Sequence, residues 1–477
     1  MNIVFVSSEI TPIAKAGGLG DVTQGLIFQL QRLQEKVTLI VPKYSFIDEK
    51  HLQSIKIHSH FKSYEKGIWI DNTAWTAQLE GVRLILIEPH HPKKYFERSE
   101  IYGYDDDIPR FAYFSRAVFD FFRHENLCMN ILHLHDWPTA LLSILYKDLF
   151  SKPTAKIVLT IHNIEHQGRC NTWDMDDIGL ESSVYKEKLK DPIYPSLNLL
   201  KGGILYADQI TTVSPTYAKE ILTKEYGYGL DPLLQQHKDK LTGILNGIDT
   251  DYWNPQTDPY LMANYSKKLS VKEISLAKSI NKRALQKKFG LTEQKGPLIT
   301  NIGRLVAQKG PALIKKAIEC TVEKTGQFVL LGTSPIPEVL EEFSQLQKSL
   351  PPSKALFFFQ QNESLSHWIY AASDFIIIPS LFEPCGLTQL IALRYGTIPI
   401  VRSTGGLKDT VFETINGYTF SEFSEEAMKK ALSNAIQDFV ENPKKIANLI
   451  PAIMNEDHSW LVSAKVYQEL YQKALIS

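Results

Sequence analysis

Residues 2–33, NIVFVSSEITPIAKAGGLGDVTQGLIFQLQRL, have the pattern of a strand, a glycine-containing loop and a helix. The run NIVFVSS (residues 2–8) is apolar and rich in β-branched residues, as buried strands are. The segment DVTQGLIFQLQRL (residues 21–33) places one set of apolar residues on a single helical face: Val22, Leu26, Ile27, Leu30 and Leu33. A strand followed by an amphipathic helix is the repeating unit of a parallel α/β sheet.

The same alternation continues along the chain in two series. The first contains KVTLIVP, RLILIE, NILHLHD, AKIVLTIHN and QITTVSP; the second begins near residue 297 with PLITNIG and continues with QFVLLGT, ALFFFQ, DFIIIPS and TIPIVRS. We therefore predict the α/β class, with two doubly wound parallel-sheet (Rossmann-like) domains facing a central cleft. Ligands of such sheets bind beyond the carboxyl ends of the strands, so the loops after the strands are the candidate sites.

The connector GILNGIDTDYWNPQTDP (residues 243–259) is rich in Gly, Asn, Asp and Pro, and it marks the domain boundary. We place the first domain at residues 1–245 and the second from residue 246. Between Lys267 and Lys288 eight basic residues recur at roughly helical spacing, which we interpret as a solvated helix face.

The composition is that of an ordinary globular protein. A chain of 477 residues exceeds the usual size of one core, and its net charge of -1 lacks the basic excess of nucleic-acid or membrane binders. The four cysteines form no CxxC pair, the N-terminus has no signal-peptide pattern, and no run approaches the roughly 20 apolar residues of a membrane span. We expect a cytoplasmic protein without nucleic-acid or membrane partners, and the sequence does not indicate its oligomeric state.

The loop KAGGLGDV (residues 15–22) invites comparison with a dinucleotide-binding fingerprint. Thr23 occupies the place of the third glycine, nine residues separate Ser8 from Gly18, and the second strand ends near Lys43 without an acidic residue for a ribose. A redox cofactor is disfavoured. The glycine N–H groups and Lys15 suit one phosphate, although a tight turn with an exposed lysine explains the stretch as well.

In the second half, two loops after strands carry charged residues. Arg304 and Lys309 follow PLITNIG, and together they can neutralise a departing diphosphate; two ordinary surface cations are the alternative. In LFEPCGLTQL, Glu383 can accept hydrogen bonds from two vicinal hydroxyls, or it can simply cap the following helix. The start of that helix and the Thr388 hydroxyl suit a phosphate.

In the first half, HLHDWPTA and TIHNIEHQG place Asp136, Trp137 and His162 at the ends of two strands. The histidines in these loops suggest a metal, but His133 and His135 share one strand face while Asp136 follows on the other, and ligand-like cysteine spacing is absent. We expect no metal. Trp137 offers a stacking surface for a sugar and His162 a neutral hydrogen-bond partner.

Taken together, these motifs resemble those of bacterial glycogen synthases and starch synthases. The resemblance rests on KAGGLGDV, HLHDWPTA, TIHNIEHQG, LKGGILYADQITTVSPTYAKEI, GILNGID, NIGRLVAQKG, FEPCGLTQLIALRYGTIPIVRSTGGLKDTV and HSWLVSAKVYQELY, in that order over nearly the whole chain. It implies a GT-B glycosyltransferase, a retaining hexosyltransferase that moves glucose from ADP-glucose to the 4-hydroxyl of an α-1,4-glucan such as glycogen. It also implies no cofactor, a second domain ending at residue 457, and a last helix (residues 458–477) that packs on the first domain.

The resemblance assigns roles to individual residues. Catalysis would rest on Arg304 and Lys309 at the leaving ADP, Glu383 at the glucose hydroxyls, His162 at the donor glucose, and Asp136 as a buried orienting group. Substrate binding would use Lys15, Gly18 and Asp21 around the diphosphate, Tyr95 and Trp137 on the sugar side, Asn246 at the glucose hydroxyls, and Cys385, Gly386, Leu387 and Thr388 around glucose and phosphate. For Cys385 the residues themselves indicate packing rather than nucleophilic attack.

The sequence differs from many related transferases at Ile391, where they carry a second glutamate. The starch synthase branch tolerates another residue at this position, so Ile391 favours that branch of the family. Without an obvious pair of carboxylates we expect a front-face reaction, in which the departing phosphate accepts the proton of the attacking hydroxyl. Two alternatives stay open at this stage: a GT-B enzyme with another donor or acceptor, and a non-catalytic glucan-binding protein.

Overall fold

The computed structural model describes residues 1–476 and divides into two compact units. Unit 1 comprises Met1–Asn246 and the segment from Trp460 onward, and unit 2 comprises Gly247–Ser459. None of the helices in the described part of the chain has the length and apolarity that a bilayer span requires. Each unit is an α/β domain built on a doubly wound sheet, so the predicted fold class is confirmed.

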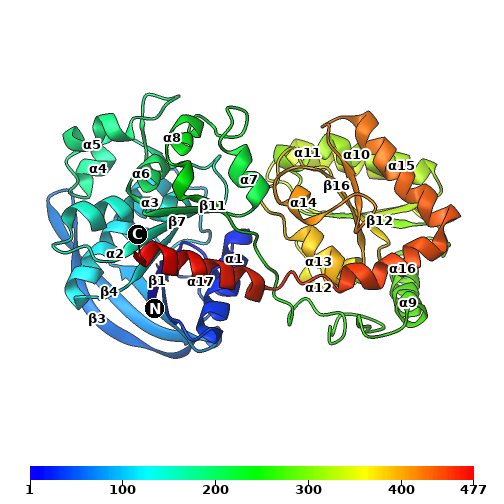
Figure 1. Ribbon diagram of the computed structural model, residues 1–477, viewed down its shortest axis with the longest axis horizontal. Helices are drawn as coiled ribbons and strands as arrows, with labels where there is room; N and C mark the ends of the chain where they lie inside the picture. Colours follow the sequence, from blue (N-terminus) through cyan, green and yellow to red (C-terminus); the bar gives the residue numbers. More distant parts are fainter. Residues whose placement is uncertain (477) are drawn as a thin grey trace. The chain divides into compact units, whose positions relative to one another are not determined.

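Unit 1 contains a nine-stranded sheet in the order β11-β10-β7-β6-β1-β2-β5-β4-β3 (Figure 1). The strands from β11 to β5 are parallel, whereas β4 pairs antiparallel with both β5 and β3. The bounds are β1 (Asn2–Val6), β2 (Lys36–Pro42), β3 (Gln53–Glu65), β4 (Ile68–Leu79), β5 (Val82–Pro89), β6 (Ile131–His135), β7 (Lys156–Ile161), β10 (Gln209–Thr212) and β11 (Leu241–Gly243), with a separate pair β8 (Arg169–Cys170) and β9 (Leu197–Asn198). The runs of unit 1 that were predicted as strands from the sequence are strands, and the structure adds β3, β4, β8, β9 and β11.

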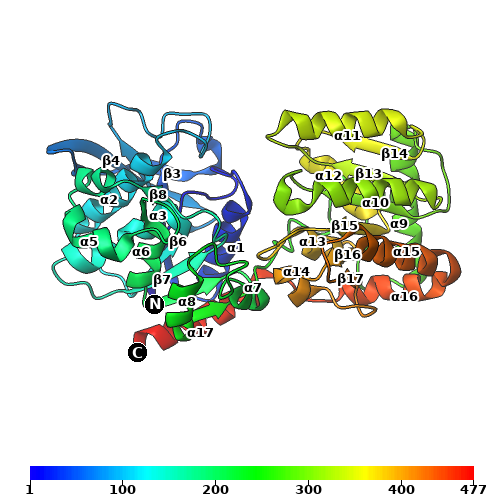
Figure 2. The same cartoon turned by 90° about the horizontal axis from the view of Figure 1, so that it is seen from above.

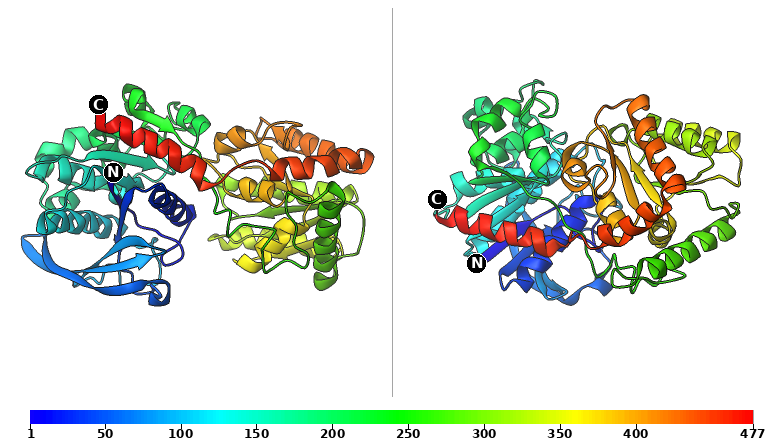
Figure 3. Two further views of the ribbon diagram at one scale, coloured as in Figure 1. Left: turned by 60° about the horizontal axis from the view of Figure 1, so that its bottom comes forward. Right: turned by 45° about the vertical axis from the view of Figure 1, so that its right-hand side comes forward.

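The helices of unit 1 are α1 (Gly18–Arg32), α2 (Asp107–Glu125), α3 (Asp136–Ile144), α4 (Thr172–Asp177), α5 (Ser182–Leu189), α6 (Leu199–Tyr206), α7 (Pro215–Glu220), α8 (Asp231–Gln236) and α17 (Trp460–Ile476). The last helix, α17, lies beside α1 although the two are at opposite ends of the sequence (Figures 1 and 3). Gly25 on α1 makes this packing possible, because a Cβ at that position would overlap the indole ring of Trp460.

Unit 2 contains a six-stranded parallel sheet in the order β14-β13-β12-β15-β16-β17. Its strands are β12 (Leu298–Ile302), β13 (Gln327–Leu331), β14 (Ala355–Phe358), β15 (Phe375–Ile378), β16 (Ile398–Arg402) and β17 (Tyr418–Phe420), and its helices are α9 (Val271–Phe289), α10 (Pro311–Glu323), α11 (Pro337–Ser349), α12 (Glu363–Ala372), α13 (Thr388–Arg394), α14 (Gly405–Thr410), α15 (Glu425–Glu441) and α16 (Pro443–Met454). Helices cover both faces (Figure 2): one core includes Ile314, Phe343 and Leu432, and the other face is filled by residues of α9, α12 and α13.

Both sheets reverse direction at one point, and this point locates the candidate sites. In unit 1 the chain builds outward from β1 to β2 and β5, then crosses to β6 on the other side of β1. In unit 2 the same reversal lies between β12 and β15. Loops on either side of such a switch point open a crevice at the carboxyl ends of the strands, which is where doubly wound domains bind ligands.

The basic segment before residue 289 is only partly the solvated face that its composition predicts. Lys278 is 5% exposed, and its ammonium group donates to the carbonyls of Ala371 and Tyr395 and to the Thr397 hydroxyl, each at 3.1 Å. Burial lowers the pKa of Lys278 to about 7. The interpretation was wrong at Lys278 because helical spacing alone does not reveal which side of α9 packs against the sheet.

Candidate active site

The glycine loop of unit 1 is held by two carboxylates. Asp21 Oδ1 accepts hydrogen bonds from Lys15 Nζ at 2.8 Å and from the Thr11 hydroxyl at 2.9 Å. Glu9 Oε2 accepts the backbone N–H groups of Ala16 and Gly17, both at 2.8 Å. The expectation of free N–H groups in this loop is therefore wrong for Ala16 and Gly17, because a buried carboxylate already binds them.

Gly18 is the first residue of α1, and the space beside it is open. A Cβ at Gly18 would meet nothing within 4 Å, and its backbone does not need a left-handed conformation. Neither crowding nor backbone angle in the protein explains a glycine here. The open space leaves the backbone at Gly18 accessible to close approach by a ligand.

Tyr95 does not lie where the resemblance would put it. Its side chain is 1% exposed, its hydroxyl donates to Glu65 Oε1 at 3.2 Å, and its ring stacks on His91 with centroids 3.9 Å apart. The expectation of a surface for a sugar is corrected here, because Tyr95 is a core residue of unit 1.

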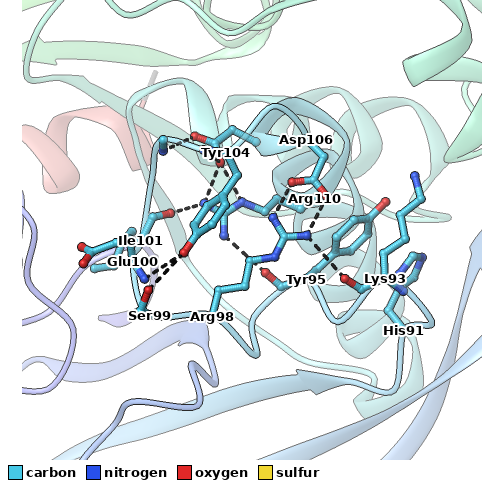
Figure 4. A network of polar contacts seen from close by, with 12 residues as sticks. His91, Lys93, Tyr95, Arg98, Ser99, Glu100, Ile101, Tyr104, Asp106 and Arg110 are labelled. Carbon is cyan, nitrogen blue, oxygen red and sulfur yellow. Dashed lines mark hydrogen bonds and ion pairs between the residues drawn. The ribbon is translucent and has the colours of Figure 1, made fainter.

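The loop that follows Tyr95 is fastened by two arginines (Figure 4). Arg98 binds both carboxylate oxygens of Asp106, and the buried Arg110 donates to the carbonyls of Tyr95 and Ile101. These contacts hold Tyr102 next to the glycine loop.

Tyr102, rather than Tyr95, contacts the candidate site. Its hydroxyl lies 2.7 Å from Ser8 Oγ and 3.0 Å from Glu9 Oε1. The sequence contained a signal for Glu9, which directly follows the first strand, but none that distinguished Tyr102 from its neighbouring tyrosines.

Asp136 and His162 lie together at the ends of the adjacent strands β6 and β7. Asp136 Oδ1 accepts the backbone N–H of His162 at 2.7 Å, and Asp136 adopts a left-handed backbone with φ of 54°. A non-glycine residue in that region stores strain of order 1–3 kcal/mol, which is typical of functional positions. Burial raises the pKa of Asp136 to about 7 and lowers the pKa of His162 to about 3.

Trp137 lies in the first turn of α3, directly after Asp136. Its ring packs edge-to-face on Phe111, and a Cβ at Gly168 would stand 2.6 Å from it. Gly168 also has a φ of 62°, so both its left-handed backbone and its close contact with the Trp137 ring require glycine. Trp137 is half-buried and retains some exposed surface for a ligand.

In unit 2 the structure brings Arg304, Lys309 and Glu383 to a single pocket of about 60 Å³ at the switch point. Lys309 Nζ lies 2.5 Å from Glu383 Oε2, and the Ser380 hydroxyl donates to the same oxygen at 2.9 Å. Glu383 is 5% exposed. One carboxylate oxygen is thus held by the protein, and within the described residues no hydrogen bond is made by the other, Oε1.

The remaining predicted residues of unit 2 surround the same pocket. Arg304 is exposed at its rim and makes no ion pair within the described part of the chain. Gly386, Leu387 and Thr388 line the pocket, and Thr388 shares a hydrogen bond with the side chain of Tyr370. Cys385 is buried beneath this turn.

Asn246 is the last residue of unit 1 before the chain enters unit 2. Its side chain is buried, and Oδ1 has no hydrogen-bond partner. Ile391, by contrast, is packed in the core of unit 2, which accounts for an apolar residue at that position.

Among the histidines near the candidate site, His135 is hydrogen-bonded to His162, and His133 is hydrogen-bonded to the hydroxyls of Thr160 and Tyr471. Over residues 1–476, no group of three or more His, Cys, Asp or Glu side chains is arranged to hold a metal ion. The side chains of the two candidate sites can hydrogen-bond to hydroxyls and stabilise an anion: unit 2 offers cations and a carboxylate, and unit 1 offers a lysine, an aspartate and a neutral imidazole.

Comparison with known proteins gives matches along both units. The family described as the starch synthase catalytic domain matches residues 2–236, and the family glycosyl transferases group 1 matches residues 282–453. A glycogen synthase of Protochlamydia amoebophila (strain UWE25) is 42% identical over 99% of each chain, and one of Bacillus cereus (strain B4264) is 39% identical over 100% of each. A probable starch synthase 4 of Arabidopsis thaliana is 42% identical over 99% of this chain and 47% of its own.

Solved structures agree with these matches. The catalytic domain of starch synthase IV from Arabidopsis thaliana, bound to ADP and acarbose, has a TM-score of 0.94 and 41% identity, covering 100% of this chain and 99% of the other. A sucrose-phosphate synthase from Thermosynechococcus elongatus has a TM-score of 0.63 at 16% identity, with 99% of each chain covered, which shows a shared fold alone.

Proposed function

Because this chain belongs to the glycogen synthase and starch synthase family of GT-B glycosyltransferases, we propose that it transfers glucose from ADP-glucose, with retention, to the 4-hydroxyl at the non-reducing end of an α-1,4-glucan. The observation that carries this proposal is the pocket in unit 2, where two cations and a buried carboxylate meet at the switch point. The ADP in the related starch synthase IV structure supports an ADP-sugar donor. The four free thiols fit a cytoplasmic protein.

In this proposal the cations of unit 2 act on the leaving group. As the bond between glucose C1 and the phosphate oxygen breaks, negative charge grows on the diphosphate, and Arg304 and Lys309 stabilise it. The glucan oxygen attacks C1 from the same face, and the departing phosphate takes the hydroxyl proton. No protein nucleophile is needed, which agrees with the absence of a close second carboxylate beside Glu383 in the lining of the described pocket.

Glu383 is assigned to the sugar. Lys309 and Ser380 fix one of its oxygens, so the other oxygen is oriented to accept a hydrogen bond from a glucose hydroxyl. Gly386, Leu387 and Thr388 supply the adjoining wall, and buried Cys385 supports the turn.

Unit 1 supplies the other proposed contacts. Lys15 and the Gly18 backbone bind the diphosphate, with Asp21 holding Lys15 in place. His162 and Asn246 bind glucose hydroxyls, Trp137 offers an apolar face, and Asp136 orients the His162 segment through its backbone N–H.

The test is the initial rate of glucose incorporation into a glycogen primer from radiolabelled ADP-glucose and, in parallel, from UDP-glucose. We expect efficient incorporation from ADP-glucose and much slower incorporation from UDP-glucose. The reverse preference would identify a different donor. Glycogen binding with no incorporation from either donor would identify a non-catalytic glucan-binding protein.

A further inference from the structure

Three histidines of unit 1 line up across the neighbouring strands β6 and β7, but only His162 belongs to the proposed site. His133 is fully buried, and both its ring nitrogens are occupied: Nδ1 lies 2.7 Å from the Tyr471 hydroxyl and Nε2 lies 2.6 Å from Thr160 Oγ1. His133 therefore has a purely structural set of partners.

His135 differs from His133 in having one ring nitrogen turned toward the site. Its Nδ1 lies 2.9 Å from His162 Nε2. The residue is 0% exposed, and its Nε2 has no hydrogen-bond partner. His162 is half-buried, and within the described residues its Nδ1 makes no hydrogen bond.

One hydrogen atom is shared between these two rings, so two arrangements are possible. Either His135 donates from Nδ1 to His162 Nε2, or His162 donates from Nε2 to His135 Nδ1. Both imidazoles are neutral near pH 7, since burial lowers the pKa of each. In the second arrangement His135 would carry its proton on Nε2 as a buried donor without an acceptor, which native proteins rarely tolerate.

We propose that His135 is a positioning residue that donates to His162 and so fixes the His162 tautomer with its proton on Nδ1. His162 then meets the substrate as a hydrogen-bond donor, and the group it binds is an oxygen atom, such as a sugar hydroxyl oxygen. The identity of that substrate rests on the proposed function, whereas the tautomer does not.

The surroundings of His135 hold its ring in the required orientation. Its backbone N–H donates to the Thr139 hydroxyl at 2.8 Å, and its ring stacks on Phe5 with centroids 5.8 Å apart. The strand register pairs His135 with Thr160, two residues before His162. Asp136 anchors the backbone of His162 at the same time.

The direct test is long-range ¹H–¹⁵N NMR of the ligand-free full chain labelled with ¹⁵N-histidine, with the His162 signals identified by their loss in His162→Gln. We expect the wild-type protein to carry the His162 proton on Nδ1. A proton on Nε2 of His162 would overturn the inference, whether or not the protein transfers glucose.

Variants extend the test to turnover. In His135→Phe the donor is lost, and we expect a mixture of His162 tautomers and a fall in kcat of about tenfold, the value of one hydrogen bond. His135→Asn can place an amide N–H near the position of Nδ1 and should restore both readouts in large part. Tyr471→Phe, which removes a partner of His133 only, is the control and should leave the His162 tautomer unchanged. An unchanged tautomer in a folded His135→Phe would contradict the inference.

A wild-type protein that shows the expected tautomer but transfers no glucose from any sugar nucleotide would refute the proposed function and leave this inference standing.

Discussion

Arg304 is the residue that tests the charge stabilisation of the leaving group most cleanly. Its guanidinium is exposed and unpaired among the described residues, so Arg304→Ala should leave the melting temperature unchanged. Loss of one charged donor to a developing anion typically lowers kcat by about 10²–10³. Lys348→Ala, which removes another exposed cation of unit 2 on α11, should leave kcat unchanged. Equal kcat of Arg304→Ala and wild type would contradict the proposed role of Arg304 in stabilising the leaving diphosphate.

Lys309 and Glu383 should behave as a pair, because their side chains share a charge-assisted hydrogen bond of 2.5 Å. We expect Lys309→Ala to lower kcat by about 10²–10³ and Glu383→Gln to lower kcat more than it weakens ADP binding. Lys309→Ala also leaves the buried carboxylate uncompensated. The double variant should then lose less than the product of the single losses. Strictly multiplicative kcat losses would show that the two side chains act independently.

Asp136 should make stability depend on pH. Burial raises the pKa of its carboxyl from 3.8 to about 7 in the folded protein, so the folded protein loses stability as the pH rises through this range. Asp136→Asn cannot ionise and still has an oxygen to accept the His162 N–H. Its melting temperature should exceed that of wild type by a margin that grows from pH 4 to pH 7 and then levels off. A margin that does not change with pH would contradict the raised pKa.

The residue scale also shows what sequence reading can and cannot find. That Arg304, Lys309 and Glu383 come together in one pocket was predictable, because each follows an apolar run typical of a buried strand. Tyr95 and Lys278 were misread because their burial depends on Glu65 and on the Tyr395 carbonyl, which lie far away along the chain. Their own neighbours in sequence carried no such information.

At the scale of elements, the packing of α17 against α1 requires a residue without a side chain at Gly25. A methyl group at Gly25 would overlap Trp460, the first residue of α17, and that indole is buried. Gly25→Ala should destabilise unit 1 by about 1–3 kcal/mol, the usual cost of overfilling a core, despite the better helix propensity of alanine. Urea denaturation measures this, with Gln29→Ala one turn further along α1 as the control. Equal midpoints for the two variants would show that α17 can shift without cost.

Most of the strands that were predicted from the sequence are buried on both faces and therefore form continuous apolar runs, although β14 alternates buried and half-buried residues. Strands β3 and β4 mix exposed and buried residues at the antiparallel end of the sheet of unit 1, and β3 is mostly polar. A strand of this kind has no continuous apolar run that the sequence would reveal. Its pairing with β4 depends on side-chain packing against neighbouring strands.

At the scale of the whole molecule, each of the two units has its own sheet and its own set of proposed substrate-binding residues. The two-domain organisation followed from chain length and from the two series of strands. The identity of the nucleotide did not follow from these residues, because a diphosphate and a hexose present the same groups whatever the base. The family relationship and the ADP of the related structure supply that part of the proposal.

The reaction proposed for this protein adds glucose in α-1,4 linkage at the non-reducing ends of a glucan. The full chain is incubated with unlabelled glycogen and ADP-glucose labelled in the glucose, and the washed polymer is digested with β-amylase, which removes maltose from the non-reducing ends of α-1,4 chains. We expect nearly all of the label to enter the polymer and to be released as maltose. Label that remains in the β-amylase-resistant core, or that appears only as free glucose, would contradict the account.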